Sequence, residues 1–446
     1  MDVSYRNNLL GLAALNWVLL VSQPTRRSML NTQEERVLKK DPTVKLPPQA
    51  VRHPQGTIYK VYFFIAISAW FNEIFLNNLY RQDYDLTSRQ INYLTLTSLV
   101  TSGLSSLFVG ALADKYGRKS TNVLFSGCYG ASVCLAMIPE LPALYAGRVL
   151  GGFATAIVFS VMDSWIVFDF FARKLIHQGC DLYRTFGTLA VINAFAAVAC
   201  SVIGDRLVWA TGSNKAPFIV SWLVMWQAMQ ALWSKFKEVY GASATDDREM
   251  IKNTPSVIKV FKRPYMWALT LAITVFEGSA LLFAFSAAPV LKSVHKSSRE
   301  LPLTYVFACI MASALVGSLS FNIVMVRRKL RFSRLLTGIL VLSNFVFFKL
   351  SRPKTERGTF WLSCLFGLLI GLYYPCISTL KARLIEEGVR ATVYSLMRAP
   401  AYLFVVTQLI LNSEAASTSK IFSISSMGFT AAFAAVWIIS FNKKIP

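Results

Sequence analysis

Charged residues are scarce in this chain of 446 residues, and their scarcity indicates the class of protein. Only 15% of the residues are Asp, Glu, Lys or Arg, whereas 54% are hydrophobic. Soluble globular domains carry about 25% charged residues. The composition therefore excludes an ordinary soluble domain and predicts an integral membrane protein.

Acidic residues are the rarer of the two charged kinds. The chain has 23 Asp and Glu against 46 Lys and Arg, a formal net charge of +23. Such an excess can indicate nucleic-acid binding, but here the cations lie in short loops between apolar runs and form no continuous basic face. We therefore expect no nucleic-acid partner and assign the cations to the anionic cytoplasmic leaflet of a lipid bilayer.

Motifs for metal, redox or nucleotide chemistry are also missing. None of the seven cysteines form Cys-x-x-Cys, which argues against a zinc or redox site, and six of them lie inside apolar segments. A P-loop is excluded because six residues separate Gly110 from Gly117 and Arg118 interrupts the motif. Since no catalytic nucleophile stands in a suitable context, we expect no metal, no cofactor and no enzymatic activity.

Long apolar runs are what the sequence does have. A membrane-spanning helix needs about 20 mostly apolar residues, and about twelve segments meet this length, which predicts an all-α membrane fold. They are 57–80, 91–113, 119–138, 141–169, 184–207, 216–233, 265–291, 302–326, 333–351, 358–380, 391–411 and 421–441. A shorter run, Leu9–Val21, fits either a signal peptide or a retained membrane-associated helix. We favour the retained helix, because cleavage would leave the basic stretch 26–60 outside.

Basic loops give the expected topology. Several short loops that follow even-numbered segments are rich in Lys and Arg, and the positive-inside rule places these loops in the cytoplasm. The cations are Lys115, Arg118, Lys119, Arg173, Lys174, Arg327, Arg328, Lys329, Arg331, Arg334, Lys381, Arg383 and Arg390. A loop on the opposite side carries Arg352, Lys354 and Arg357, which weakens the pattern without reversing it.

A long polar stretch divides the segments into six and six. We therefore expect an N-terminal apolar helix and basic linker (1–56), a six-helix bundle (57–233), a cytoplasmic loop (234–264) and a second six-helix bundle (265–446). Such a division suggests internal duplication. Glu73 in "WFNEIF" and Glu277 in "TVFEGSA" stand at similar depths of the first and seventh segments, a faint echo between the halves.

The loop "GALADKYGRKS" carries the most specific pattern. Its order of residues, from Gly110 through Asp114 and Gly117 to Arg118 and Lys119, resembles the signature between the second and third helices of the major facilitator superfamily. The resemblance implies two six-helix bundles around a central cavity. It also implies that Asp114 and Arg118 help to lock one side of a transporter closed.

Further stretches resemble one eukaryotic branch, the molybdate-anion transporter family. The similar blocks are "GRVLGGFATAIVFSVMDSW" from Gly147, "FEGSALLFAFSAAP" from Phe276 and "GLYYPCISTLKARLIEEGVRATVYSLMRAP" from Gly371. Three family motifs are altered: Asp-Trp is Ala69-Trp70, Trp-Thr-Pro is 287–289 (Ala-Ala-Pro), and Arg-x-Pro-Leu-Asn is 398–402 (Arg-Ala-Pro-Ala-Tyr). These departures concern the substrate more than the fold.

Two arginines inside apolar segments are candidates for binding an anion. A buried charge costs about 2.5–3.5 kcal/mol on insertion scales, so Arg148 and Arg398 each need a function or a partner. A guanidinium offers paired donors that match two oxygens of an oxyanion such as molybdate. The alternative is an ion pair with a carboxylate of another helix, and the sequence leaves both open. The resemblance also links Arg148 to substrate or proton coupling.

Three carboxylates and two tyrosines complete the candidate set. Burial favours the protonated form of a carboxyl, which suits Glu73, Asp163 and Glu277 as proton carriers, with structural ion pairs as the alternative. Asp163 is the least central because it lies late in its segment. Tyr373 and Tyr374 precede Pro375 and could offer hydroxyls to a cavity or serve as packing.

Together these features predict a secondary transporter working by alternating access. The resemblance implies molybdate or a similar oxyanion as substrate, with protons as a candidate coupled ion. A sugar or organic-solute porter of the same superfamily and a non-transporting membrane receptor or scaffold are the alternatives. We expect a multi-pass monomer in the plasma membrane or an organelle membrane.

Overall fold

Helices account for all the regular structure that the computed structural model describes, namely residues 5–23, 55–173, 175, 180–235, 240, 256–296, 301–328, 330–412 and 418–441. This confirms the expected all-α class. The basic linker up to residue 54, most of the 234–264 loop, Lys174 and Lys329 lie outside the described residues.

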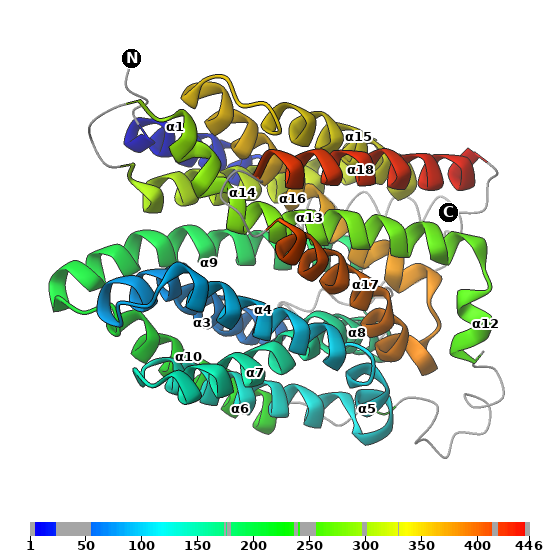
Figure 1. Cartoon of the computed structure of the whole chain (residues 1–446). Helices are drawn as coiled ribbons and strands as arrows, with labels where there is room; N and C mark the ends of the chain where they lie inside the picture. The colour runs from blue at the N-terminus through cyan, green and yellow to red at the C-terminus, as the bar shows by residue number, and fades with distance from the viewer. Residues whose placement is uncertain are drawn as a thin grey trace.

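The first bundle contains six helical segments, three of them composite (Figure 1). They are α3 (Gly56–Asn78) with η1 (Leu79–Asp83), α4 (Ser88–Ser105) with α5 (Val109–Tyr116), α6 (Arg118–Ala136), α7 (Leu141–Ile157) with η2 (Val158–Met162) and α8 (Asp163–Ala172), α9 (Leu182–Thr211) and α10 (Ala216–Lys235). The elements η1 and η2 are π-helical turns, which often occur at functional sites.

The second bundle also contains six long helices. They are α13 (Pro264–Val294), α14 (Leu303–Arg328), α15 (Phe332–Leu350), α16 (Glu356–Leu384), α17 (Arg390–Leu411) and α18 (Thr418–Phe441). The short α12 (Val257–Phe261) precedes α13, and the 3-10 turn η4 (Glu387–Val389) precedes α17. Each bundle is built around its own large cluster of buried apolar side chains.

Length and composition support most of the expected spans. Nine of the described helices are long and apolar enough to cross a membrane, and α4 with α5 makes a tenth span with a bend of 50°. The remaining two of the twelve positions, α6 and α10, do not reach this apolarity but pack against each other within the first bundle. One reason is clear in α6, which begins with Arg118 and Lys119 and carries Asn122.

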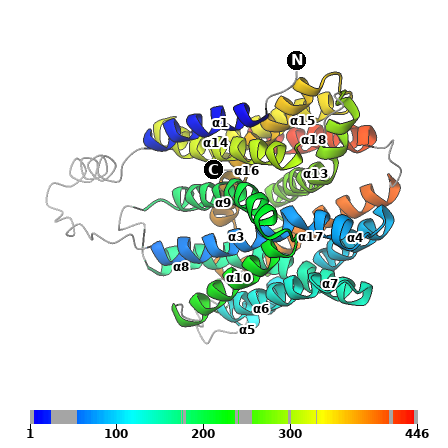
Figure 2. The ribbon, with the colours of Figure 1, turned by 90° about the vertical axis from the view of Figure 1, so that its left-hand side faces the viewer.

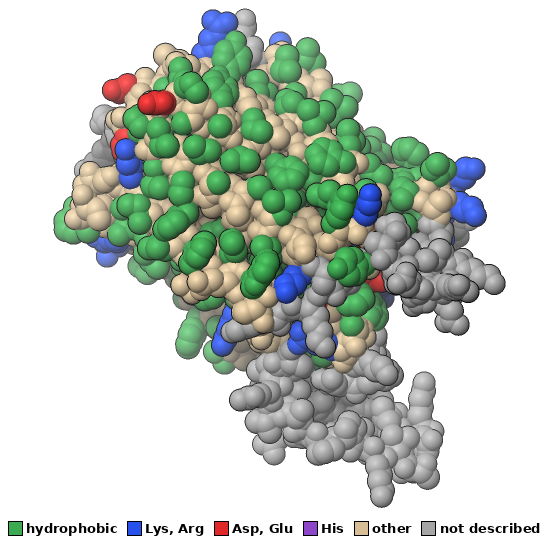
Figure 3. Space-filling model, turned by 90° about the horizontal axis from the view of Figure 1, so that it is seen from below, with side chains coloured by type: hydrophobic (Ala, Val, Ile, Leu, Met, Phe, Trp, Pro, Cys, Tyr) green, Lys and Arg blue, Asp and Glu red, His purple; other side chains and the backbone are tan. Residues whose placement is uncertain are grey.

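The outer surface matches a lipid environment. Figure 3 shows a face covered largely by hydrophobic side chains, with Lys and Arg gathered toward its rim. Large apolar side chains are exposed on several helices, including Trp209 at 80%, Trp233 at 68% and Leu403 at 68%. Such a surface would be costly in water and is expected in contact with acyl chains.

The N-terminal helix α1 (Tyr5–Val21) packs along α14 (Figure 2). Asn16 donates to the carbonyl of Ala312 at 2.9 Å, and Gln23 donates to that of Leu319 at 3.1 Å. The hydroxyl of Tyr5 bonds to Glu356, the first residue of α16. The extra helix therefore belongs to the second bundle and runs parallel to α14.

Glycines bring α14 and α16 unusually close. A Cβ on Gly371 would collide with the carbonyl of Ala314, and one on Gly367 would collide with that of Ile310. Ser318 also donates to the carbonyl of Gly371 at 3.3 Å. The Gly-x3-Gly pair of α16 thus serves helix packing, as small residues commonly do between membrane helices.

Candidate functional site

The two bundles meet at one end of the molecule through the loop "GALADKYGRKS". We call this the basic end; α5 and α12 lie there, at the right of Figure 1. A Cβ on Gly110 would collide with the backbone of Ala391 and Thr392 in α17, so glycine allows α5 to touch the other bundle. Gly117 has φ of 103°, a conformation that glycine adopts readily, and it turns the chain from α5 into α6.

Asp114 caps a helix of the opposite bundle. Its Oδ2 accepts hydrogen bonds from the backbone N–H of Thr392 at 3.1 Å and from the hydroxyl of Thr392 at 2.8 Å. Thr392 lies in the first turn of α17, whose own preceding residue, Val389, provides no side-chain cap. The carboxylate therefore satisfies a free helix N–H and faces the positive end of the helix dipole.

Arg118 completes this contact and is fully buried. Its guanidinium pairs with Asp114 at 3.1 Å and also with the carboxylate of Glu387 in η4. It donates in addition to the backbone carbonyl of Glu387 at 2.8 Å. Arg390 pairs with the same glutamate, so the four charges form one network across the two bundles. We call Asp114, Arg118, Glu387 and Arg390 the rim network.

Lys119, the last residue of the signature, lies elsewhere. Its ammonium stands 5.7 Å from the ring centroid of Trp233 on α10, within the first bundle. At the start of α13, Arg263 pairs with Glu386 at 2.7 Å, and the hydrogen bond that the guanidinium donates to this carboxylate raises the pKa of Arg263. Both cations thus have partners among the described residues.

A second ion pair joins the bundles deeper inside. Asp163, at the junction of η2 and α8, accepts from Lys381 at 3.2 Å and from the hydroxyl of Ser378 at 3.0 Å, both on α16. Lys381 is buried and also stands 4.5 Å from the ring centroid of Tyr394 on α17. From the sequence alone Lys381 is only a basic loop residue, because its partner lies 218 positions away.

The face of the second bundle that meets the first holds an arginine–glutamate pair. Arg398 Nη1 of α17 lies 3.1 Å from Glu277 Oε2 of α13, and both side chains are less than a tenth exposed. The guanidinium also stands 3.6 Å from the ring centroid of Phe159, which belongs to η2 of the first bundle. The structure therefore brings two sequence candidates, Arg398 and Glu277, into one pair at the interface of the bundles.

The two neighbouring tyrosines differ in their surroundings. Tyr373 is fully buried in the apolar core of the second bundle and stacks on Phe276, with ring centroids 3.7 Å apart. Tyr374 is half-buried, and its ring centroid lies 5.5 Å from that of Tyr373. Tyr373 therefore serves packing, whereas Tyr374 is partly accessible.

Arg148 and Glu73 lie in the first bundle. Arg148 is 9% exposed, and its guanidinium stands 5.7 Å from the ring centroid of Tyr80. Among the described residues, no carboxylate oxygen lies within 4 Å of Arg148. Glu73 is exposed although it lies within the long helix α3.

These residues form layers along the molecule. The rim network comes first at the basic end, then Asp163 with Lys381, then Arg398 with Glu277, and Arg148 with Glu73 lies toward the other end. The described part of the chain holds no cluster of three His, Cys, Asp or Glu side chains suited to a metal ion. The arrangement is therefore that of two six-helix bundles joined through buried charge pairs.

Comparison with known families agrees with this arrangement. Residues 42–353 match the family described as sugar transporters with 12 transmembrane segments, and the chain belongs to this family. It is therefore a multi-pass integral membrane protein.

Curated relatives carry a narrower name. The chain is 28% identical over 411 residues to a molybdate-anion transporter of Takifugu rubripes, covering 83% of this chain and 82% of the relative. It is 25% identical over 394 residues to the molybdate-anion transporter of Xenopus tropicalis, covering 85% and 84%.

Solved structures share the fold. A human organic anion transporter, MFSD10 (TETRAN), superposes with a TM-score of 0.64 at 14% identity, covering 86% of this chain and 100% of the other. The Escherichia coli fucose:proton symporter FucP superposes with a TM-score of 0.66 at 10% identity, covering 86% and 98%. At these identities the likeness concerns the fold alone, and it confirms the major facilitator architecture.

Proposed function

We propose that the chain is a secondary active transporter that moves molybdate or a similar oxyanion by alternating access. The observation that carries the proposal is the pair of buried arginines, Arg148 and Arg398, placed on the inner elements of opposite bundles. Planar guanidinium groups present paired donors to oxyanions. The name of the relatives supports the same substrate class.

The Arg398–Glu277 pair suggests how a proton would accompany the anion. While Glu277 is ionised, it neutralises Arg398 at 3.1 Å and competes with an incoming anion. Protonation of Glu277 removes this competition and frees the guanidinium. A doubly charged oxyanion moving toward a negative interior also gains from a cotransported positive charge.

We further propose that the basic end is cytoplasmic and that it is closed in this conformation. The rim network and the Asp163–Lys381 pair both join the bundles there. These contacts must separate before substrate leaves on that side. Closing one end with a few kcal/mol of charge pairing is enough to bias a two-state equilibrium.

The direct test is uptake of radiolabelled molybdate by proteoliposomes of purified protein, with and without an inward proton gradient. Wild type is expected to accumulate molybdate, more strongly with the gradient. Arg148→Lys and Arg398→Lys keep the charge but lose the paired donors, so uptake should fall by about tenfold or more at normal protein levels. Arg206→Lys, on an exposed position of α9, is the matched control.

Three outcomes decide among the hypotheses. Absence of molybdate uptake by wild type contradicts the anion proposal. Uptake by both Lys variants at the wild-type rate removes the direct-ligand role. If Arg398 were only structural, Lys would be tolerated, while Arg398→Ala would lower expression by leaving Glu277 unpaired, at a cost of about 3–5 kcal/mol.

A sugar or organic-solute porter is the second candidate, and one contact favours it. Trp70 of α3 donates to Asn193 of α9 at 3.2 Å and lies 5.7 Å from the ring of Phe307 on α14. An aromatic face beside an amide suits a neutral solute with several hydroxyls. Uptake of a labelled sugar panel, including fucose, in the same proteoliposomes separates this candidate from the oxyanion. Saturable binding without any uptake would instead indicate a receptor.

A further inference from the structure

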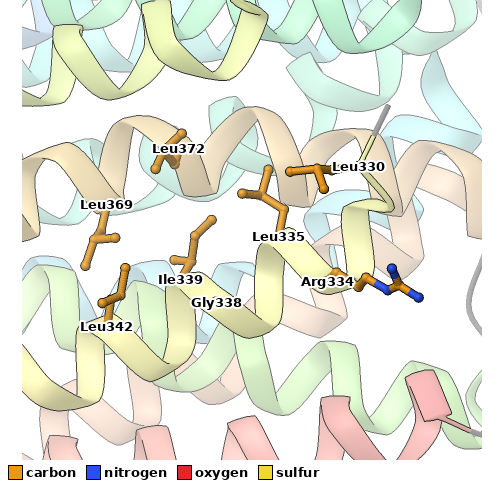
Figure 4. Close-up of a pocket in the computed structure, with 8 residues that line it drawn as sticks. All are labelled: Leu330, Arg334, Leu335, Gly338, Ile339, Leu342, Leu369 and Leu372. Carbon is orange, nitrogen blue, oxygen red and sulfur yellow. The ribbon is translucent and has the colours of Figure 1, made fainter. Parts of the chain in front are cut away.

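An apolar groove lies on the second bundle between α15 and α16, away from the charged layers (Figure 4). Its volume is about 240 Å³. The walls are formed by Leu335, Ile339 and Leu342 from α15 and by Leu369 and Leu372 from α16. Apart from Arg334 at one end, the lining residues drawn in Figure 4 are apolar, so the groove suits a hydrocarbon chain.

The groove exists because Gly338 leaves space within it. A Cβ on Gly338 would meet no atom within 4 Å, in contrast to the tightly packed Gly367 and Gly371 of α16. Leu342 is 47% exposed, so the groove opens to the surface that faces lipid. From Arg334 to Leu342 the helix rises by about 12 Å, which accommodates most of one acyl chain in one leaflet.

Positive charge lies at one end of the groove. Arg334 stands beyond Leu335 in Figure 4, and both Arg334 and Arg331 are exposed. Among the described residues, neither arginine has a carboxylate oxygen within 4 Å. Arg383 reaches the same corner, with its guanidinium 4.6 Å from the ring centroid of Phe332.

The start of α15 adds to this positive field. The helix begins at Phe332, and its preceding residue, Arg331, makes no side-chain cap. The dipole of α15 favours a negative group at this end of the helix. An apolar groove with cations at one end is complementary to a lipid that has an anionic headgroup and an acyl chain.

We propose that the α15–α16 groove binds one anionic phospholipid of the leaflet at the basic end. One acyl chain lies along Gly338 between the leucines, and the phosphate contacts Arg334 and the first turn of α15. The bound lipid fills the gap between two helices of the second bundle and so stabilises it. This site is separate from the proposed oxyanion path and does not depend on the transported substrate.

Native mass spectrometry of delipidated protein tests the site with two probes, phosphatidylglycerol and phosphatidylcholine of the same acyl chains. Wild type should retain one phosphatidylglycerol about fivefold more readily than phosphatidylcholine, a difference typical of a cation near an anionic lipid. Gly338→Leu fills the groove without a collision and should abolish this retention. Arg334→Gln should remove the headgroup preference while phosphatidylcholine binding persists.

Matched controls and a stability readout complete the experiment. Gly127→Leu, at a glycine of α6 with open space around its Cα, and Arg206→Gln should both behave as wild type. Phosphatidylglycerol should raise the Tm of wild type and leave that of Gly338→Leu unchanged. Equal phosphatidylglycerol retention by wild type and Gly338→Leu overturns the proposal. Equal binding of the two lipids by wild type also overturns it. Displacement of the retained lipid by oleate at equal concentration overturns it as well.

Discussion

At the residue scale, Asp114 illustrates how one carboxylate can serve two helices. It pairs with Arg118 on its own side and accepts two hydrogen bonds from Thr392 on the other. Arg118 cannot leave this site cheaply either, because it is fully buried and its other partner, Glu387, belongs to the opposite bundle. Removing one charge from such a network leaves a buried charge without its partner.

Asp114→Asn should preserve folding, because Arg118 keeps Glu387 as a partner, while impairing transport. The amide oxygen can still accept from Thr392, but the charge facing Arg118 and the end of α17 is lost. Losing about 1–2 kcal/mol at a helix terminus shifts a two-state equilibrium about 5- to 30-fold. Uptake in proteoliposomes, normalised to folded protein, measures the effect. Asp205→Asn, on an exposed position of α9, is the control, and normal uptake by Asp114→Asn would show that the rim network has no gating role.

For each contact between the two bundles, the sequence predicts one of the two partner residues better than the other. The loop signature points to Asp114 and Arg118, but their partners Glu387 and Thr392 lie 269 and 278 positions away. No local pattern relates residues so distant, because only the association of the bundles brings them together. The same holds for Arg398 and Glu277, which the sequence singles out separately and only the fold pairs.

At the scale of the elements, the contact between α14 and α16 depends on small residues. Gly371→Leu places a side chain against the carbonyl of Ala314 and the N–H of Ser318, so the helices must separate. Overpacking of this kind typically costs about 1–3 kcal/mol. We expect a lower Tm and a lower yield of monodisperse protein, measured by thermal unfolding in detergent.

Gly127→Leu is the matched control for this variant, because a Cβ there meets nothing within 4 Å. Both substitutions add the same side chain to a helical glycine. An equal loss of stability in the two variants would mean that helix propensity or hydrophobicity, rather than the close approach of α14 and α16, determines the result.

The position of α1 predicts on which side of the membrane the N-terminus lies. Its 17 residues extend about 26 Å, and Tyr5 contacts the start of α16 at the end opposite the rim network. The residues before Tyr5 and the loop at Arg331 should therefore lie on opposite sides of the membrane. Epitope tags at residue 2 and after Arg331, probed in intact and permeabilised cells, check this; labelling of both tags from one side would show that α1 does not cross.

Length alone could not have established this helix. Leu9–Val21 is shorter than a typical span, and its sequence allows a signal peptide as well as a retained helix. The hydrogen bonds from Asn16 and Gln23 to backbone carbonyls of α14 are what place it. They also explain why Asn16 stands in the apolar part of α1, since its amide has a hydrogen-bond partner only when α14 is packed against it.

At the scale of the whole molecule, the two bundles are joined at the basic end by buried groups that would be exposed in an open state. Ser395 of α17 is 1% exposed, and its hydroxyl donates to the carbonyl of Ser106 at 2.7 Å across the interface. A cysteine at this position should react with a membrane-impermeant maleimide only when the bundles separate.

We therefore expect slow labelling of Ser395→Cys from the basic side of oriented vesicles, and labelling several-fold faster when molybdate is added. The background protein carries Ser in place of Cys128, Cys134 and Cys180, the three cysteines that are not buried. Lys262→Cys, exposed at the same end, controls for access and should label at a constant rate. Rapid labelling of Ser395→Cys without substrate would contradict a closed basic end.

The surface shared by α5 and the start of α17 has a practical consequence for trapping the protein. The backbone of Gly110 touches that of Ala391 and Thr392, so residues from both bundles form one continuous patch only while they are in contact. An antibody fragment selected against this composite epitope would recognise a single conformation. It would arrest the transport cycle without competing for the substrate, and its binding would report the fraction of molecules in that conformation in a native membrane.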